Sequence, residues 1–376
     1  MVIAFKQIAR YVMILLRQTG PAQLQYVPVP VAVRRRRLPR PWQLTVLMLL
    51  LALLFIAACS SRPAAPTPPP LEPVTLQLQW VTQAQFAGYY VALDKGWYAE
   101  EGIELTIKPG GPDILAADSV VAGAAGVGTS LLADIIVAIQ QGKPLVSIGQ
   151  IQQTNGLLLI AKKDSGIEQP QQFAGKSVGV WLGSWEAQFD ALVAKEGLDP
   201  QDFQLVSQGF SMDSFIAGEL DVASAMIYNE YYQVLESGID AGDINIIDYA
   251  DYGLDFPGDV LFTSRRMTQE RPELVTGMLR ASLRGWQYAV DHPEEAVDIV
   301  LKYDKSGQQT RDHQLSMMNE IAKLVQITVR PLGYTDRADV RRTIDTLLTY
   351  GVLADLLQPE DVYTDQFWNQ AQARQE

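Results

Sequence analysis

The sequence predicts an α/β protein, in which helices pack against β-sheets. From residue 74 onward, short segments with the alternating pattern of a strand are followed by longer segments with the apolar spacing of a helix, an order typical of layered α/β folds. No internal repeat of about 20 to 50 residues is present, which argues against a solenoid. The part of the chain after residue 73 spans about 300 residues, enough for two domains at roughly 100 to 200 residues each.

The first predicted unit begins with a strand at 74–80, where apolar and polar residues alternate strictly. The elements that follow are, in order, a helix at 88–101, a strand at 103–107, an apolar helix at 131–141 opened by small residues at 126–130, and strands at 145–151 and 157–161.

A second unit begins at 175–181 with a strand that runs into a helix at 185–196. Its other predicted elements are a strand at 203–206, a helix at 212–217, a buried strand at 222–227, a helix from Glu230 and a strand at 244–247. After a loop at 251–259, a strand at 260–263 leads into long helices from residue 272 to 303 and beyond. This order indicates that the second unit is inserted within the first.

The N-terminal segment has the layout of an export signal. A basic run at 34–37 precedes an apolar stretch at 44–58, which ends in small residues before Cys59. The sequence Ile56-Ala57-Ala58-Cys59 resembles a bacterial lipobox, in which the cysteine becomes the lipidated first residue. An uncleaved signal anchor is the alternative, but the apolar stretch is shorter than the roughly 20 residues that span a bilayer. We therefore predict a signal peptide at 1–58 and, at 59–73, a lipidated Cys59 with a proline-rich tether.

Charge and composition exclude several functions. Removal of residues 1–58 leaves 22 basic residues against 43 acidic ones, a balance that disfavours nucleic acid and anionic membrane surfaces as partners. Because Cys59 is the single cysteine, neither a disulfide scaffold nor a thiolate metal site is expected. The two histidines, His292 and His313, lie in polar helical segments, so a histidine-based hydrolase is disfavoured and both are expected at surfaces or helix ends. We expect no metal and no cofactor.

Six short motifs in a fixed order carry a resemblance to a known family. They are Trp80 followed by Gln85-Phe86-Ala87-Gly88-Tyr89-Tyr90, Lys95-Gly96-Trp97-Tyr98, Gly126-Val127-Gly128, Gly142-Lys143-Pro144, Gly175-Lys176-Ser177-Val178-Gly179 and Gly218-Glu219-Leu220-Asp221-Val222. From about residue 75 to 330 the chain resembles the solute-binding lipoproteins of the thiamine-pyrimidine-synthase-like superfamily.

The resemblance implies a two-lobed type II periplasmic-binding-protein fold with the ligand between the lobes. It places two crossover strands at 157–163 and 260–265, a first lobe at 74–163 plus 260–376, and a second lobe at 164–259. Members of the superfamily deliver vitamins, pyrimidine precursors, sulfonates or nitrate to ATP-driven importers. The implied partners are therefore a small molecule, the permease subunits of the importer and, through Cys59, the outer face of the cell membrane. We expect a monomer.

Aromatic residues at strand ends and helix starts are the main candidates for ligand contact, because ligands of open α/β sheets bind beyond the carboxyl ends of strands. They are Trp80, Phe86, Tyr89, Tyr90, Trp181, Trp185, Tyr228 and Tyr231. Within the superfamily, this set is most similar to the riboflavin-binding branch, since a flat isoalloxazine ring gains from aromatic stacking. Each residue also has a packing alternative: Trp80 could cap the core, and one of the consecutive Tyr89 and Tyr90 must face away from the cleft.

Polar candidates accompany the aromatic ones, and an ordinary structural role is an alternative for each. Thr129 and Ser130 stand at a helix start, where they bind a ligand oxygen or cap the helix. Glu230 either accepts hydrogen bonds from a ligand or complements the helix dipole. The remaining candidates are Gln85, Gln152, Asn155, Ser184, Asn229 and Asp259.

An enzyme related to the pyrimidine synthases is the alternative from another class. The resemblance places Phe86 where those enzymes carry a histidine that becomes substrate, and the chain has no cysteine-rich motif. We therefore predict a receptor that binds riboflavin. Binding of a formylaminopyrimidine remains an alternative, because one ring could use the same tryptophans. A sulfonate is disfavoured, since the candidates lack an arginine cluster.

Overall fold

The computed structural model describes residues 42, 45–46, 48–49, 70–183 and 185–373. The chain divides into two compact units, Met1–Thr67 and Pro68–Glu376, and all elements discussed below belong to the second. Cys59, and with it the predicted lipidation site, lies outside the described residues. In the part of the chain that is described, no helix is both long and apolar enough to cross a membrane.

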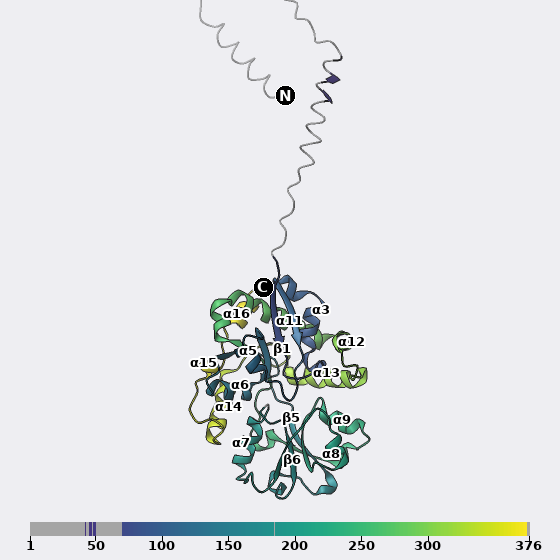
Figure 1. The fold of residues 1–376 in the computed structure, drawn as a ribbon, viewed down its shortest axis with the longest axis vertical. Coiled ribbons are helices and arrows are strands. Elements are labelled where there is room, and N and C mark those ends of the chain that lie inside the picture. Colours follow the sequence, from purple (N-terminus) through teal and green to yellow (C-terminus); the bar gives the residue numbers. More distant parts are fainter. Residues whose placement is uncertain (1–41, 43–44, 47, 50–69, 184, 374–376) are drawn as a thin grey trace, which may run out of the picture. The chain divides into compact units, whose positions relative to one another are not determined.

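The first lobe is built on a five-stranded mixed sheet with the order β2-β1-β3-β10-β4. Strand β1 is labelled in Figure 1. Its strands are β1 (Glu72–Gln77), β2 (Ile103–Lys108), β3 (Val127–Leu131), β4 (Leu145–Gln150) and β10 (Asp259–Ser264). Strand β1 runs parallel to β2 and β3. Strand β10, which returns from the other lobe, is antiparallel to β3 and β4. The carboxyl ends of β1 and β3 therefore point to the same edge of this sheet.

The second lobe repeats this plan with the order β7-β6-β8-β5-β9. Its strands are β5 (Leu157–Lys162), β6 (Ser177–Val180), β7 (Gln204–Ser207), β8 (Val222–Met226) and β9 (Ile244–Asp248). Strand β6 runs parallel to β7 and β8, whereas β5 is antiparallel to β8 and β9. Segment 157–163 was predicted as a crossover strand of the first lobe, but its strand β5 pairs only within the second sheet.

The chain instead crosses between the lobes in the loops that precede β5 and β10, at 151–156 and 254–258. The two crossings are hydrogen-bonded to each other, through Asn155 N–H to the Phe256 carbonyl and Gly258 N–H to the Gln152 carbonyl, both at 3.1 Å. A Cβ atom at Gly258 would lie 2.8 Å from the Thr154 carbonyl oxygen. Only glycine allows this approach of the two backbones.

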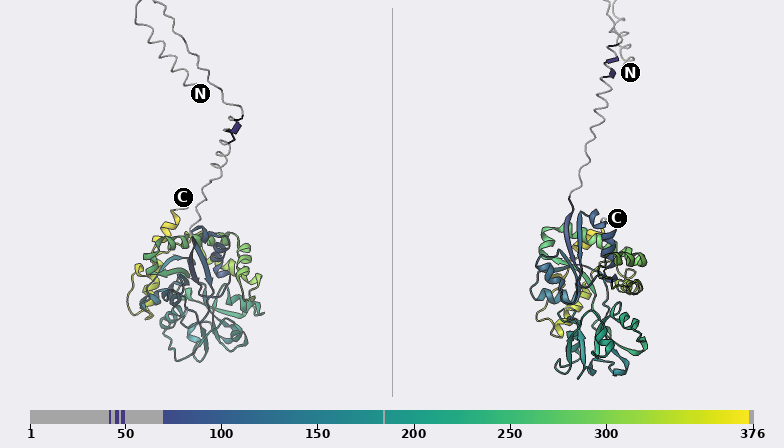
Figure 2. Two further views of the ribbon diagram at one scale, coloured as in Figure 1. Left: turned by 45° about the horizontal axis from the view of Figure 1, so that its top comes forward. Right: turned by 45° about the vertical axis from the view of Figure 1, so that its right-hand side comes forward.

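Helices pack on both sheets, and the helix positions agree closely with the sequence pattern. Around the first sheet lie α3 (Ala87–Asp94), α4 (Trp97–Glu100), α5 (Ala116–Val121), α6 (Leu132–Gln140), α10 (Arg265–Glu270), α11 (Pro272–Asp291), α12 (Pro293–Tyr303), α13 (Arg311–Val325), α14 (Arg337–Thr349), α15 (Pro359–Val362) and α16 (Gln366–Gln372). The second lobe contains α7 (Ala187–Lys195), α8 (Asp213–Ala217) and α9 (Glu230–Glu236) (Figure 2).

Two sequence features explain how the predicted long helices are divided. The helix predicted at 88–101 is split into α3 and α4 because Gly96 adopts a φ of +75°. The segment from residue 272 to 303, predicted to form long helices, divides into α11 and α12 at His292, since Pro293 cannot continue the hydrogen-bond ladder. Helices α3 and α11 pack at glycines: a Cβ atom on Gly285 would lie 2.0 Å from the Gly88 carbonyl oxygen. This close packing holds α3, and the loop before it, against the first lobe.

Candidate functional site

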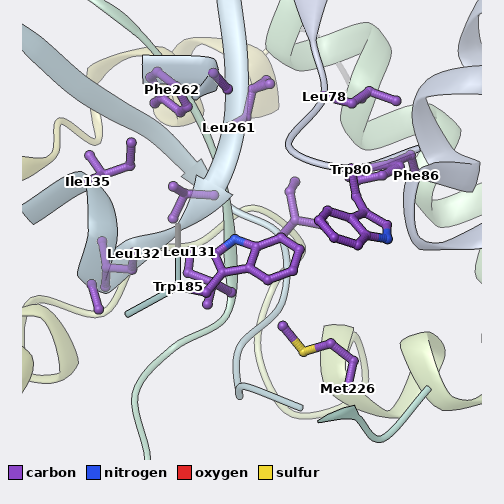
Figure 3. Packing of buried hydrophobic residues seen from close by; sticks show 14 of the residues in the cluster. Leu78, Trp80, Phe86, Leu131, Leu132, Ile135, Trp185, Met226, Leu261 and Phe262 are labelled. Atoms are coloured by element: carbon purple, nitrogen blue, oxygen red, sulfur yellow. The ribbon is translucent and has the colours of Figure 1, made fainter. Parts of the chain in front are cut away.

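Three tryptophans from the two lobes meet at the edge where the strands end. Figure 3 shows two of them, Trp80 and Trp185. Trp80 follows β1 of the first lobe, while Trp181 and Trp185 follow β6 of the second. The Trp80 ring centroid lies 5.8 Å from that of Trp181 and 4.9 Å from that of Trp185, and the latter two are 5.0 Å apart. Their exposed fractions are 2%, 2% and 3%. These three residues, which we call the tryptophan cluster, join the lobes through aromatic contacts.

The backbone that carries the cluster in the second lobe is unusual. Trp185 adopts a left-handed φ of +63°, a conformation that is costly for a bulky residue. Its N–H donates to the Asp134 carboxylate of α6 at 3.1 Å, and the Trp181 indole N–H donates to the Gly209 carbonyl at 3.1 Å. The half-exposed Phe210 adds a fourth ring, 4.9 Å from Trp80. Hydrogen bonds thus fix the positions of Trp181 and Trp185.

A buried carboxylate, Asp259, lies at the start of β10. One of its oxygens accepts from Gln79 Nε2 at 2.8 Å and the other from Gln85 Nε2 at 2.9 Å. Burial raises the pKa of Asp259 to about 6, and the two amide donors oppose this shift. Gln79 precedes Trp80 directly, so this network connects β10 with the segment that presents the Trp80 ring. It also leaves the Gln79 Oε1 atom buried without a hydrogen-bond partner.

A second buried carboxylate, Glu230, begins α9 in the other lobe. It accepts from the Met226 N–H at 3.0 Å and from Asn229 Nδ2 at 2.6 Å. Burial raises the pKa of Glu230 to about 7, while these hydrogen bonds oppose the shift. Burial also raises the pKa of the neighbouring Tyr228 hydroxyl well above its usual value, and the charges of Asp259 and Glu230 add to the effect. Each lobe therefore contains a buried carboxylate of raised pKa, and the charges of both act on Tyr228.

Two cavities border the tryptophan cluster. The first, of about 780 Å³, is lined by Ser130 and Asp134 of the first lobe and by Trp185 and Glu186 of the second. The second, of about 730 Å³, includes Trp80, Tyr90 and His313 from the first lobe and Phe210 and Asn229 from the second. Both cavities have the volume of small-molecule sites. Among the described side chains, no group of three or more His, Cys, Asp or Glu residues is placed to hold a metal ion.

Several predicted ligand contacts have packing or structural roles. Phe86 is fully buried in the core, and Tyr89 packs edge-on against Trp286 with ring centroids 5.7 Å apart. Tyr231 packs against Tyr232 and the apolar core of the second lobe. Thr129 and Ser130, predicted at a helix start, lie instead in strand β3, where Thr129 accepts a hydrogen bond from the Gln79 N–H at 3.1 Å. These side chains support the cleft from within the lobes.

The other predicted residues lie nearer the cleft or at the crossings. Tyr90 is the member of its pair that lines a cavity, and its hydroxyl is 2.8 Å from the Thr82 hydroxyl. Asn155 donates to Gln188 of α7 at 2.6 Å, which ties a crossing to the second lobe. The Gln152 side chain lies buried at the same crossing, near Tyr228. Ser184 lies outside the described residues.

The sequence pattern missed four residues of this region: Gln79, Asp134, Phe210 and His313. His313 lies in the first turn of α13, in agreement with the expectation of a surface or helix-end role, but its side chain is buried and bridges the lobes. Its Nδ1 lies 2.9 Å from Glu236 Oε1 and its Nε2 lies 3.0 Å from Asn229 Oδ1. Asp134 is the single charged residue in the apolar helix 131–141, which is a signal that could have identified it. His313 carries no comparable signal, because its partners are distant in sequence.

Two lobes, each built on a five-stranded mixed sheet, with aromatic and carboxylate side chains between them, define the class of two-lobed α/β proteins. The type II periplasmic-binding-protein fold is shown by likeness to solved structures. The periplasmic nitrate-binding protein NrtA from Synechocystis PCC 6803 matches with a TM-score of 0.62 at 13% identity, covering 81% of this chain and 89% of NrtA.

Sequence relatives identify the family. The model of the family described as NMT1/THI5 like matches residues 83–296, more than half of the chain, and the protein belongs to this family. The formylaminopyrimidine-binding protein of Halalkalibacterium halodurans is 27% identical over 333 residues, covering 85% of this chain and 97% of that protein. The riboflavin-binding protein RibY of Chloroflexus aurantiacus is 29% identical over 344 residues, covering 84% and 95%.

The family also contains enzymes. The 4-amino-5-hydroxymethyl-2-methylpyrimidine phosphate synthase of Legionella pneumophila is 30% identical over 230 residues, covering 60% of this chain and 72% of the synthase. The two binding proteins thus match over a larger share of this chain than the synthase does.

Proposed function

We propose that this protein is the extracytoplasmic solute-binding receptor of an ABC importer, and that its ligand is riboflavin. The observation that carries the proposal is the tryptophan cluster, in which rings from both lobes meet at the ends of strands. A flat, poorly hydrated ring system that enters between these rings would contact both lobes at once. It would thereby stabilise the closed form, which is the form that a permease can recognise.

The polar groups near the cluster suit an uncharged ligand rich in donors. The carboxylates Asp259 and Glu230, together with the amides of Gln79 and Asn229, can accept hydrogen bonds from an imide N–H or from ribityl hydroxyls. Among the described residues that line the first cavity, the cation is Lys143, which is paired with Asp118 at 2.6 Å. In the first cavity this arrangement disfavours a sulfonate, nitrate or phosphorylated ligand, because each would need unpaired basic groups. The second cavity also contains Lys305, so this argument does not extend to it.

A formylaminopyrimidine is the second candidate ligand. The same tryptophans can stack on a single ring, and a relative of comparable identity is named for this ligand. An enzymatic role has less support: Phe86 lies in the core where the synthases are expected to carry a reactive histidine. We further propose that lipidation of Cys59 anchors the receptor to the outer face of the cell membrane.

The first test is the identity of the molecule that the protein retains. The full chain is purified in detergent and denatured, and any released compound is identified by absorbance and mass spectrometry. Refolded protein is then titrated with riboflavin and with formylaminopyrimidine. Released flavin and saturable rebinding would support the proposal. Saturable binding of formylaminopyrimidine alone would indicate that this compound, and not riboflavin, is the ligand. Binding of neither compound would refute both ligands.

A further inference from the structure

The N-terminus of α7 in the second lobe is capped from the first lobe. The helix starts at Ala187, and its own N-cap residue, Glu186, makes no capping hydrogen bond. Asp134 of α6 instead accepts hydrogen bonds from the backbone N–H groups of Trp185, at 3.1 Å, and of Ala187. The first N–H groups of a helix need such an acceptor, and a carboxylate there also complements the helix dipole. The Asp134 side chain thus accepts hydrogen bonds at the start of a helix in the opposite lobe, as the side chain of an N-cap residue normally does within its own helix.

The same contact determines the conformation of Trp185. This residue has a φ of +63°, and a non-glycine residue in this region is held only by its surroundings. The hydrogen bond from its N–H to Asp134 is one such restraint. The Trp185 ring packs against Trp80 and Trp181. Asp134 therefore influences the position of this ring through the backbone of Trp185, without contacting the other two rings as a stacking partner.

The surroundings of Asp134 make this contact sensitive to protonation. Burial raises the pKa of Asp134 to about 7; the hydrogen bonds from Trp185 and Ala187 oppose the shift, and the nearby carboxylates Glu186 and Asp190 add to it. Separation of the lobes would return Asp134 to water and move it away from α7, which would bring its pKa back towards its ordinary value of 3.8.

Other charged or titratable groups line the same cavity. Lys143 is paired with Asp118, and Tyr350 follows the end of α14, the helix that packs on both α6 and α7. A group whose pKa is higher in the closed form stabilises that form fully below its ordinary pKa. This stabilisation is lost as the pH rises through the raised value. Closure is therefore favoured on the acid side.

We propose that Asp134 is a positioning residue of the binding site: it reaches across the cleft to hold Trp185 and the start of α7, and so links closure of the lobes to the uptake of a proton. The contact is independent of the nature of the ligand. The inference rests on the proposed function only in the choice of ligands for the first part of the test.

The first part of the test measures ligand affinity against pH for the full chain in detergent, with riboflavin and with formylaminopyrimidine. Wild-type affinity should fall about tenfold between about pH 5.5 and about pH 7 and then level off. Asp134→Asn keeps an acceptor oxygen but cannot ionise, so its affinity should depend less on pH than that of the wild type, and the dependence that remains reflects Asp259 and Glu230. Asp134→Ala should bind more weakly at every pH. The control Glu104→Gln, an exposed carboxylate of β2, should retain the wild-type profile.

The second part needs no ligand. Thermal unfolding of wild type and Asp134→Asn is compared over the same pH range, and the Tm difference should move in favour of the variant as the pH rises through about 7. Equal pH dependence of the two proteins in both parts would overturn the inference. If neither compound binds but the Tm difference follows pH as expected, the proposed ligands are wrong and the role of Asp134 in holding the lobes stands.

Discussion

The two contacts between the lobes on either side of the tryptophan cluster differ in the groups that form them. Between α6 and α7, one carboxylate, Asp134, meets backbone N–H groups of the opposite lobe. Between α13 and α9, side chains meet side chains: His313 contacts Asn229 and Glu236, and the Tyr232 hydroxyl donates to Glu320 at 2.9 Å. The first contact depends on one residue and the second is distributed over several.

This difference indicates which of the two contacts can regulate the closure of the lobes. Among single substitutions only proline removes a backbone donor, so the α6–α7 contact changes mainly through Asp134 and its protonation. In the α9–α13 contact every partner is a side chain, and the loss of one leaves others in place. We therefore expect pH to act mainly on the first contact and single substitutions on the second to have graded effects. The following substitutions test this comparison, from the largest expected effect to the smallest.

Substitutions in the tryptophan cluster, which lies between the two contacts, should reduce ligand affinity most. Trp181→Ala or Trp185→Ala should weaken ligand binding by about 1 to 3 kcal/mol, because each ring lost removes stacking area from both the ligand and Trp80. Phe210→Ala serves as the matched comparison and should have a smaller effect, since that ring is half-exposed. Titration with riboflavin and formylaminopyrimidine measures the change, and thermal unfolding verifies the fold. Unchanged affinity in both tryptophan variants would refute the stacking model.

Glu230 tests whether the α9 side also responds to pH. Its raised pKa, about 7, means that its contribution to stability is present below its ordinary pKa and is lost as the pH rises through 7. Glu230→Gln should lower the free energy of unfolding by about 1 to 2 kcal/mol at acid pH, because an amide cannot accept both hydrogen bonds. The difference in the free energy of unfolding between the wild type and the variant should become smaller above neutral pH. Denaturant titrations at several pH values measure it; a constant deficit would show that Glu230 does not ionise in this range.

His313→Ala removes two hydrogen bonds between the lobes and should weaken ligand binding by about 1 kcal/mol. Because Tyr232 and Glu320 still connect α9 with α13, the loss should be partial. His292→Ala, at the exposed end of α11, is the control and should bind ligand as the wild type does. Equal affinities of the His313 variant and the control would mean that the His313 contact does not contribute to closure.

The smallest effect is expected for Tyr232→Phe. The hydroxyl that donates to Glu320 is only partly buried, so its removal should reduce ligand affinity by about 0.5 kcal/mol. The double variant Tyr232→Phe with His313→Ala should lose more ligand-binding free energy than the sum of the two single losses if the two contacts substitute for each other. A double-mutant cycle provides this measurement, and strict additivity would indicate that the two contacts act independently.

Much of the fold followed from local patterns. Strict alternation at 74–80 predicted β1 to within a few residues, and the apolar run at 131–141 predicted α6. The presence of aromatic residues at strand ends predicted where the cleft lies, because side chains after parallel strands gather at one edge. The assignment of 157–163 to the first lobe failed, since a run of apolar residues does not reveal which sheet a strand joins.

The candidate site was predictable only in part. Trp80, Trp181 and Trp185 could be named from their places after strands, but their contact across the lobes could not. Tyr89 and Tyr90 are neighbours with equal local signals, and only the packing of α3 against α11 decides that Tyr89 contacts Trp286.

What the sequence determined alone is the set of elements and the kinds of side chains at their ends, because periodicity and turn chemistry act over a few residues. The tertiary structure decided which side chains meet. Asp134 lies some 50 residues before the N–H group that it binds, and His313 lies more than 75 residues after its partners. Such contacts arise only when the two lobes are brought together, since their energy depends on burial and geometry that no local pattern records.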